Sequence, residues 1–207
     1  MKNFSIILGA IILALFVTLV IWGVYCDNTI AITNYCVNNT KNDAKLKFVV
    51  ITDLHNKEYG EKNADLAELV KEQNPDFIAV CGDMVNRGDP DTTKMKDVLE
   101  KLSKIAPTYC CLGNHERDNA AKFGTDFKSE TDSTGAVLLD NEYIKFTKNG
   151  KSVLIGGMSD YPYYEFYTPD DDVPSITMWE EFDEKANNKF TSLLHHQPEY
   201  IAEDAKK

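Results

Sequence analysis

The sequence is short of positive charge. It has 22 Lys and Arg against 33 Asp and Glu, a formal net charge of −11 over 207 residues. Lys2 is the only charged side chain in residues 1–25, so the rest of the chain carries the whole negative balance. A body of this charge repels nucleic acid, and no nucleic-acid partner is expected. Carboxylates gathered in one site repel each other until a cation neutralises them, so a bound metal is one way to accommodate the excess.

Cysteine is present without a disulfide or zinc-binding pattern. The five cysteines are an odd set with no regular spacing, and none form a C-x-x-C pair, so a disulfide framework is not expected. Three of them lie in apolar runs and are predicted to be small buried side chains: Cys81, Cys110 and Cys111. The chain also lacks internal repeats and low-complexity tracts, and its length allows one domain with a sizeable core.

Charge is missing altogether from residues 4–25, FSIILGAIILALFVTLVIWGVY. A helix of about 20 apolar residues spans the hydrocarbon core of a bilayer, ~30 Å. Trp22 and Tyr25 fall where an interfacial aromatic belt would lie. A cleaved signal peptide is the competing interpretation, but its apolar core is usually only about 7–15 residues long and the GVYCDN that follows is a poor cleavage site. An uncleaved transmembrane anchor over residues 1–25 is the favoured interpretation.

The anchor predicts a single-pass protein of the cell membrane. Lys2 precedes the apolar run, and the next Lys or Arg is Lys41. This bias favours a cytoplasmic N-terminus and an extracytoplasmic body. The polar, Asn-rich residues 26–44 are interpreted as a tether, and residues 45–207 as the folded domain.

The folded domain alternates apolar runs with helical patterns. FVVIT (48–52), FIAVC (77–81) and TYCCL (108–112) are continuous apolar runs, typical of strands covered on both faces. Between them, apolar residues recur twice at helical spacing. The order strand, helix, strand, helix, strand predicts an α/β core with parallel strands.

The second half of the domain predicts further strands. A short apolar run at 137–139 is followed by EYIKF and SVLIGG, which flank Asn149-Gly150 and predict an antiparallel hairpin. A helix is predicted over about 177–188, and FTSLL (190–194) is predicted to be the last strand.

Side chains that can bind metal follow four of these strands. In chain order they are Asp53, His55, Asp83, Asn114, His115 and His196. Each short motif is common by chance, and a lone Gly-Asp or His at a strand end is more often a turn or a surface residue than a ligand. Their occurrence after four strands that share one edge is the evidence for a site, because open α/β sheets bind ligands at the carboxyl ends of their strands. Oxygen and imidazole ligands without thiolate suit Mn, Fe or Zn.

The motifs DLH, GDMVNRG, GNHE and HHQPE follow one another within residues 46–200. In this order they resemble the successive blocks of the calcineurin-like metallophosphoesterases, and with the leading apolar helix the chain is most similar to the membrane-associated bacterial branch of that family. The resemblance implies a two-sheet α/β sandwich with a dinuclear metal centre at the strand ends. It also implies hydrolysis of a phosphomonoester or phosphodiester by a hydroxide that two divalent metal ions activate, the ions being Mn, Fe or Zn.

The resemblance further implies a role for each metal ligand. Asp53 and His55 would bind the first metal ion, and Asp83 would bridge both ions with one carboxylate. Asn114, through its amide oxygen, and His196 would bind the second ion. A neutral amide adds no negative charge, so the centre stays electrophilic.

Two more residues would act on the substrate. His115 would not be a ligand; it would contact the scissile phosphate and protonate the leaving oxygen. Arg87 falls where some members of the family use an arginine to hold the phosphate. His195 is predicted, by strand alternation, to point to the side opposite His196 and to serve packing rather than metal binding.

The sequence departs from the family in two places. Asn86 stands where many relatives have an aspartate that pairs with the GNHE histidine, so His115 is expected to be a weaker acid. The family's closing Gly-His-x-His block is absent from the sequence. The expected fold is therefore the sandwich without its last strands, and each metal ion keeps three protein ligands.

Three functions are compatible with these observations. The leading one is a membrane-anchored, metal-dependent phosphoesterase, whose location suggests cell-envelope or lipid-linked phosphoesters as substrates. The second is a truncated or degenerate family member, catalytically impaired and with weak or no metal binding, which the missing block supports. The third is an α/β binding domain whose polar residues lie at strand ends by chance.

Overall fold

The computed structural model describes residues 2–37, 45–158, 182, 184–185 and 190–197. The chain divides into two compact units, Met1–Val37 and Asn38–Lys207. The first unit contains helix α1 (Lys2–Asp27). The second contains, in chain order, β1 (Phe48–Ile51), the 3-10 helix η1 (Glu61–Asn63), α2 (Ala64–Glu72), β2 (Phe77–Cys81), α3 (Thr93–Ser103), β3 (Thr108–Cys111), α4 (Asn114–Phe123), α5 (Phe127–Asp132), β4 (Val137–Leu138), β5 (Glu142–Lys148), β6 (Lys151–Gly157) and β7 (Thr191–Leu194).

Helix α1 is long and apolar enough to cross a membrane. Its large apolar side chains are exposed all along the helix, Phe16 and Leu19 among them, and the ring of Trp22 lies 6.0 Å from that of Tyr25. Apolar side chains on every face of a helix suit a lipid environment rather than water. A signal sequence shares these properties, so the anchor at 1–25 and the tether that follows it stay predictions.

Four parallel strands form the first sheet, sheet A, in the order β1-β2-β3-β4. Strands β2 and β3 are buried along almost their whole length, as their continuous apolar runs predicted. The three predicted strands at 48–52, 77–81 and 108–112 agree with β1, β2 and β3 to within one residue at each end. The parallel α/β core is confirmed.

Strand β1 lies at the edge of sheet A, which its apolar run did not predict. Phe48 and Val50 are 37% and 55% exposed. The ring of Phe48 stacks on Phe77 of β2 with 4.7 Å between centroids. The prediction that β1 is covered on both faces is wrong, because Phe48 and Val50, which point to the same face of the strand, are exposed.

Three strands form the second sheet, sheet B, in the order β5-β6-β7. Strands β5 and β6 form the predicted antiparallel hairpin, and β7 runs parallel to β6. Asn149 and Gly150 have φ of 53° and 75°, the left-handed conformation that a two-residue hairpin turn requires. The last strand is confirmed, but it belongs to sheet B, so the strands that carry the site come from both sheets. The helix predicted over 177–188 lies outside the described residues apart from 182 and 184–185.

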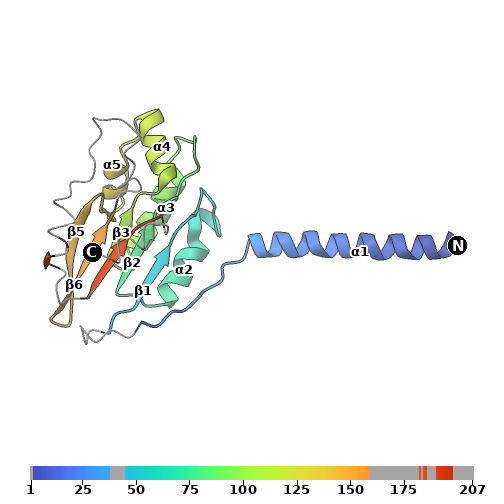
Figure 1. Ribbon diagram of the computed structural model, residues 1–207, viewed down its shortest axis with the longest axis horizontal. Helices are drawn as coiled ribbons and strands as arrows, with labels where there is room; N and C mark the ends of the chain where they lie inside the picture. The colour runs from blue at the N-terminus through green and yellow to red at the C-terminus, as the bar shows by residue number, and fades with distance from the viewer. Residues whose placement is uncertain (1, 38–44, 159–181, 183, 186–189, 198–207) are drawn as a thin grey trace. The chain divides into compact units, whose positions relative to one another are not determined.

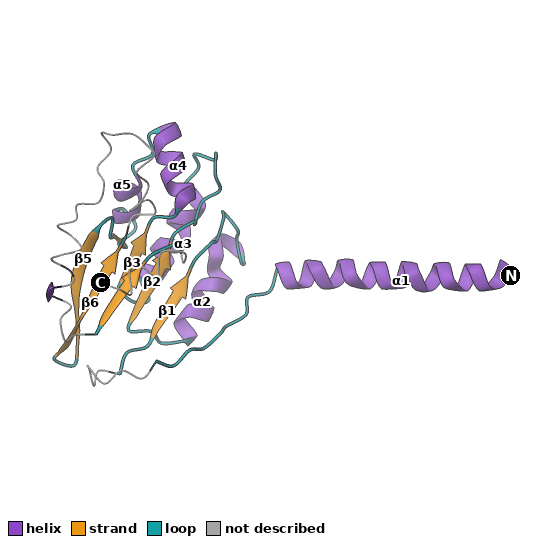
Figure 2. Ribbon diagram, viewed as in Figure 1, coloured by secondary structure: helices purple, strands orange, loops and turns teal. Residues whose placement is uncertain are grey.

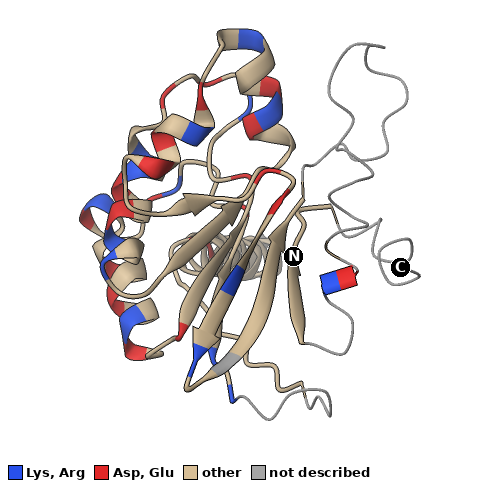
Figure 3. Ribbon diagram, turned by 90° about the vertical axis from the view of Figure 1, so that its left-hand side faces the viewer, with Lys and Arg blue, Asp and Glu red and all other residues tan. Residues whose placement is uncertain are grey.

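Sheets A and B pack face to face, and helices α2 and α3 lie over the other face of sheet A (Figures 1 and 2). The core between the sheets is a cluster of buried side chains from both: Phe77, Ala79, Tyr109, Cys111, Leu139, Val153, Ile155 and Leu194. Burial of this apolar surface from two sheets is the main stabilising term of such a sandwich. Charged residues of both signs lie mostly on the helices (Figure 3). The predicted two-sheet α/β architecture is confirmed.

Phe77→Ala should lower the free energy of unfolding by about 3–5 kcal/mol, since Phe77 is fully buried and packs against Phe48, Tyr109 and Phe146. Denaturant unfolding of the full chain in detergent micelles measures the change. Phe123→Ala is the control, because Phe123 is 40% exposed at the end of α4 and should change stability by less than about 1 kcal/mol. Equal midpoints for the two variants would contradict the assigned core.

Candidate metal centre

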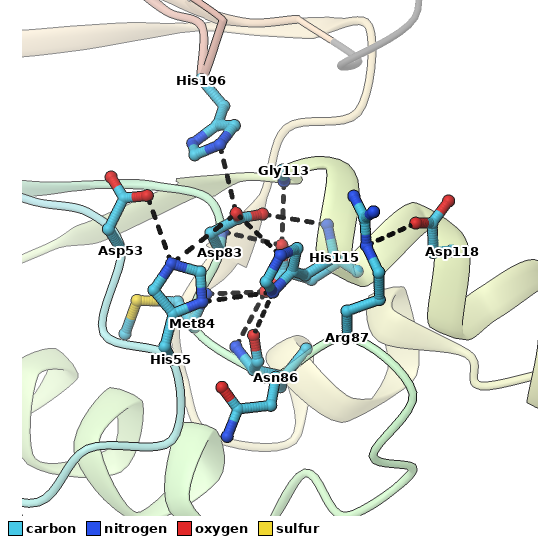
Figure 4. Close-up of polar contacts among 12 residues, drawn as sticks. Asp53, His55, Asp83, Met84, Asn86, Arg87, Gly113, His115, Asp118 and His196 are labelled. Atoms are coloured by element: carbon cyan, nitrogen blue, oxygen red, sulfur yellow. Dashed lines mark hydrogen bonds and ion pairs between the residues drawn. The ribbon is translucent and has the colours of Figure 1, made fainter.

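Four of the five residues predicted to bind metal, Asp53, His55, Asp83 and His196, converge where the strands of the two sheets end (Figure 4). Among the described residues, two groups of side chains have all their ligand atoms within 4.8 Å of one another. One group is His55, Asp83 and His115, and the other is Asp53, Asp83 and His196. Asp83 belongs to both groups, so one carboxylate lies between two sets of donors.

Left-handed backbone at the strand ends turns three of these side chains toward the centre. Asp53, His55 and Asp83 have φ of 56°, 48° and 53°. The turn after β1 is bound to the turn after β2, since the N–H of Asp53 donates to Gly82 O at 3.1 Å and that of His55 to Asp83 O at 3.0 Å. Non-glycine residues adopt this conformation at a cost in free energy, and such residues cluster at functional sites.

Two glycines let the turns after β2 and β3 touch. A Cβ on Gly113 would lie 2.3 Å from Asp83 Oδ1, and one on Gly82 would lie 2.5 Å from the Gly113 nitrogen. Gly82 has a φ of 73°, which also favours glycine, whereas Gly113 has a φ of −98° that any residue can adopt. Gly113 is therefore required for space alone.

Asp83 is the central carboxylate and is 3% exposed. Its Oδ1 accepts the His115 N–H at 2.9 Å, and its Oδ2 lies 3.4, 3.6 and 3.9 Å from Nε2 of His196, His115 and His55. Burial opposes ionisation, but the hydrogen bonds to His196 and to the His115 N–H, with the charges of both imidazoles, outweigh it and hold the pKa of Asp83 below its usual value. The ionised carboxylate is thus the stable form that a cation needs.

The histidine tautomers show that the donor set fits a cation. His196 Nδ1 lies 2.9 Å from Cys81 O, and His115 Nδ1 lies 3.1 Å from Val85 O. A carbonyl oxygen only accepts, so each Nδ1 carries a hydrogen and each ring turns its Nε2 toward Asp83 Oδ2, at 3.4 and 3.6 Å. A proton on Nε2, or a cation between Nε2 and Oδ2, completes each contact.

Asn114 begins helix α4 beside Asp83. With protein partners alone, hydrogen bonding favours its amide nitrogen toward Asp83 Oδ2, at 3.2 Å, and its oxygen toward Arg87 Nη2. A cation beside Oδ2 favours the reverse orientation, with the predicted ligand atom toward the cation. Arg87 Nε donates to Asp118 Oδ2 at 2.8 Å, and this ion pair keeps the half-exposed guanidinium near Asn114.

His115 lies against His55, with their Nδ1 atoms 3.1 Å apart and their ring centroids 4.6 Å apart. Its Nδ1 also meets the Val85 carbonyl oxygen, whereas the Asn86 side chain extends away from it (Figure 4). A backbone carbonyl therefore orients this imidazole, and the weaker acidity expected of His115 stays a prediction. The structure groups His115 with the ligands, and its role as an acid stays a prediction.

Glu116 belongs to the site although no role followed for it from the sequence. It is 2% exposed, and its carboxylate accepts four backbone N–H groups, those of Asp83, Met84, Val85 and Gly113. The sequence contains one indication of this role: Glu116 follows Gly113 by three residues, which is the spacing of a capping box at the N-terminus of a helix. Helix α4, which the sequence analysis did not predict, begins there.

The cysteines beside the centre are small core side chains, as predicted. Cys110 and Cys111 are buried and Cys81 is half-buried. Burial raises the pKa of the Cys110 thiol far above its usual value, so this sulfur stays protonated. Neither ligand group includes a cysteine, which agrees with an oxygen and imidazole donor set.

Comparison with known proteins finds relatives of this chain. The model of the calcineurin-like phosphoesterase family matches residues 46–206. The uncharacterized metallophosphoesterase YkoQ of Bacillus subtilis (strain 168) is 28% identical over 120 residues, and the phosphodiesterase YaeI of Escherichia coli (strain K12) is 30% identical over 119 residues. Each match covers 56% of this chain and 44% of the relative. Among solved structures, the phosphopantetheinyl hydrolase PptH from Mycobacterium tuberculosis matches with a TM-score of 0.40 at 20% identity, over 77% of this chain and 58% of that one.

Two facing sheets with carboxylates and imidazoles at their strand ends are consistent with a metallophosphoesterase domain. The chain belongs to the calcineurin-like phosphoesterase family, as its motifs predicted. Members of this family bind divalent metal ions, and each of the two groups offers ligand atoms that could hold one. The chain spans less than half the length of YkoQ and YaeI.

Proposed function

We propose that the chain is a membrane-anchored metallophosphoesterase that hydrolyses a phosphomonoester or phosphodiester with two divalent metal ions, Mn, Fe or Zn. The observation that carries the proposal is the sharing of Asp83 by two ligand groups. A carboxylate that serves two sets of donors is the feature that a dinuclear centre needs in order to keep its ions about 3.5–4 Å apart.

The residues divide between the two ions as the family motifs imply. Asp53 and His55 would hold the first ion, and Asn114 and His196 would hold the second, with Asp83 as the bridge. The donor atom of His196 is supported by the orientation of its ring, since Nδ1 meets the Cys81 carbonyl oxygen and Nε2 faces Asp83 Oδ2. When bound, the two ions polarise the phosphate and lower the pKa of a bound water to supply the nucleophile.

The protein's own groups act on the phosphate and on the leaving oxygen. His115 protonates the leaving oxygen from Nε2, and the Val85 carbonyl at Nδ1 keeps the ring oriented for that transfer. Arg87, held by Asp118 through Nε, binds the non-bridging phosphate oxygens through its guanidinium nitrogens. His115 lies beside Asp83, and Arg87 lies beside Asn114, so both groups border the proposed metal ligands.

The apolar helix suggests where the reaction takes place. Residues 1–25 would anchor the chain in the cell membrane and residues 26–44 would tether the domain that follows. The charge bias across the helix supports an extracytoplasmic domain. A domain held at that surface would meet cell-envelope or lipid-linked phosphoesters.

Full-length protein in detergent micelles should hydrolyse p-nitrophenyl phosphate or bis(p-nitrophenyl) phosphate in the presence of Mn²⁺, and a chelator should abolish turnover. His115→Ala should lower the turnover number by about 10²–10⁴-fold, because the leaving oxygen loses its proton donor. Calorimetric titration with Mn²⁺ should give the same affinity for this variant as for the wild type, since His115 is assigned no ligand role.

Two results would count against the proposal. Folded protein that binds Mn²⁺ and turns over neither substrate would refute the hydrolase. A large loss of Mn²⁺ affinity in His115→Ala would instead make His115 a ligand, which its place in the first ligand group allows, and would remove it from the role of acid.

A further inference from the structure

Glu116 is a buried carboxylate that binds no substrate and no metal ion in the proposed function. Among the described residues its polar partners are backbone N–H groups: Oε1 accepts those of Met84 and Val85 at 2.7 and 3.1 Å, and Oε2 accepts those of Asp83 and Gly113 at 2.8 and 2.9 Å. Hydrogen bonds to an ionised acceptor are about twice as strong as neutral ones. Four of them on one side chain make Glu116 the main polar link between the turns after β2 and β3.

We propose that Glu116 is a positioning residue of the metal centre, which holds the bridging carboxylate of Asp83 and the imidazole of His115 in place. The inference rests on the proposed function, because it concerns the same centre. It adds a residue that neither touches the ions nor faces the substrate, and that acts through the backbone of others.

The path from Glu116 to Asp83 is direct. The Asp83 N–H is held by Glu116 Oε2 while the Asp83 carboxylate Oδ1 accepts the His115 N–H. The residue has a left-handed φ of 53°, which needs outside contacts to be maintained. With backbone and Oδ1 both fixed, Oδ2 is left at the point where three imidazole Nε2 atoms meet.

The path from Glu116 to His115 passes through Val85. Glu116 Oε1 binds the Val85 N–H, and the carbonyl of the same residue lies 3.1 Å from His115 Nδ1. Val85 is fully buried, so its two peptide groups have no water to replace a lost partner. Release of the N–H would let the carbonyl move and would free the imidazole to rotate.

Asn119 offers a matched comparison on the same helix. It is 1% exposed, accepts the Gly88 N–H at 2.7 Å, and donates to the carbonyls of Asn86 and Asp89 at 2.9 and 2.8 Å. Glu116 thus holds the first part of the loop after β2, which contains the proposed metal ligand Asp83. Asn119 holds the later part of the same loop, which contains no proposed metal ligand. Loss of either residue should lower the stability of the fold, whereas only loss of Glu116 should also weaken metal binding.

The test compares Glu116→Gln with Asn119→Ala in the full chain, in detergent micelles, by Mn²⁺ calorimetry and by thermal unfolding in a chelator. Gln keeps the volume of Glu but can accept N–H groups at one atom only. Both variants should unfold at lower temperature than the wild type. Glu116→Gln should raise the Mn²⁺ dissociation constant about 10–100-fold, the usual effect of removing a residue that supports metal ligands indirectly. Asn119→Ala should raise it by less than about threefold. Asp83→Asn serves as the reference for loss of the centre.

The outcomes separate the inference from the proposed function. If Glu116→Gln binds Mn²⁺ like the wild type while Asp83→Asn does not, the centre exists and Glu116 does not position it. If Asp83→Asn binds like the wild type, the proposed metal centre itself is wrong. Should Glu116→Gln fail to fold, Glu116→Asp decides: it keeps the charge but is too short to reach all four donors, and wild-type Mn²⁺ affinity in that variant overturns the inference.

Discussion

Asp83→Asn should abolish tight Mn²⁺ binding and lower kcat/KM by about 10³-fold or more, the largest effect expected of any single substitution in this chain. The substitution replaces the one carboxylate that both ligand groups share by a neutral amide. Oδ2 faces the three imidazoles and Oδ1 accepts the His115 N–H, so an amide has to place its nitrogen, which binds no cation and accepts no hydrogen bond, at one of these two positions. The measurements are Mn²⁺ calorimetry and turnover of the two nitrophenyl substrates.

Asp89→Asn is the matched control for Asp83→Asn. Asp89 lies in the same loop and accepts hydrogen bonds from Asn56 and from the Asp91 N–H, but it belongs to neither ligand group. The same change of charge six residues away should therefore leave Mn²⁺ affinity within about threefold of the wild type. Equal losses in the two variants would show that net negative charge, and not the position of Asp83, retains the metal.

Gly113→Ala should cost the protein most of its metal affinity through one added methyl group. The new Cβ would lie 2.3 Å from Asp83 Oδ1 and 2.6 Å from the Asp83 nitrogen, far inside van der Waals contact. Relief of the overlap requires the turn after β2 to move, at about 1–3 kcal/mol of stability. Asp83 moves with that turn, so the Mn²⁺ dissociation constant should rise about 100-fold. This is at least the loss of affinity that follows removal of a residue that supports a metal ligand indirectly.

Gly124→Ala separates this steric effect from loss of helix stability. Gly113 precedes helix α4 and Gly124 follows it. Gly124 has a φ of 70°, and a Cβ added there would have no atom within 4 Å. Alanine there costs about 1–2 kcal/mol through backbone strain and should leave Mn²⁺ binding unchanged. If Gly113→Ala binds Mn²⁺ as tightly as Gly124→Ala at a similar unfolding temperature, the close approach of the two turns is not what places Asp83.

The strands were predictable because burial on both faces leaves a direct trace in the sequence. The runs at 77–81 and 108–112 are apolar at almost every position and became the buried β2 and β3. The run at 48–52 has the same pattern and became an edge strand. A strand's neighbours are set by the order of the whole sheet, which no local pattern records.

Helix α4 shows the opposite limit. Its residues, NHERDNAAKF, are mostly polar and lack the apolar spacing from which helices are predicted. Polar residues inside the helix, Glu116 and Asn119, are buried against the loop after β2 rather than against apolar surface. Hydrophobic periodicity cannot detect a helix that is held by hydrogen bonds to a loop about thirty residues earlier in the chain.

The sequence by itself determined the family, the two-sheet α/β class and the set of metal-competent side chains, because strand-forming runs and the residues that follow them are local features. Only the tertiary structure decided that Asp83 lies within reach of three imidazoles, that backbone carbonyls set the tautomers of His115 and His196, and that a buried glutamate joins the two turns. Those contacts join side chains to atoms of segments far apart in the chain, so they depend on how the sheets and loops pack.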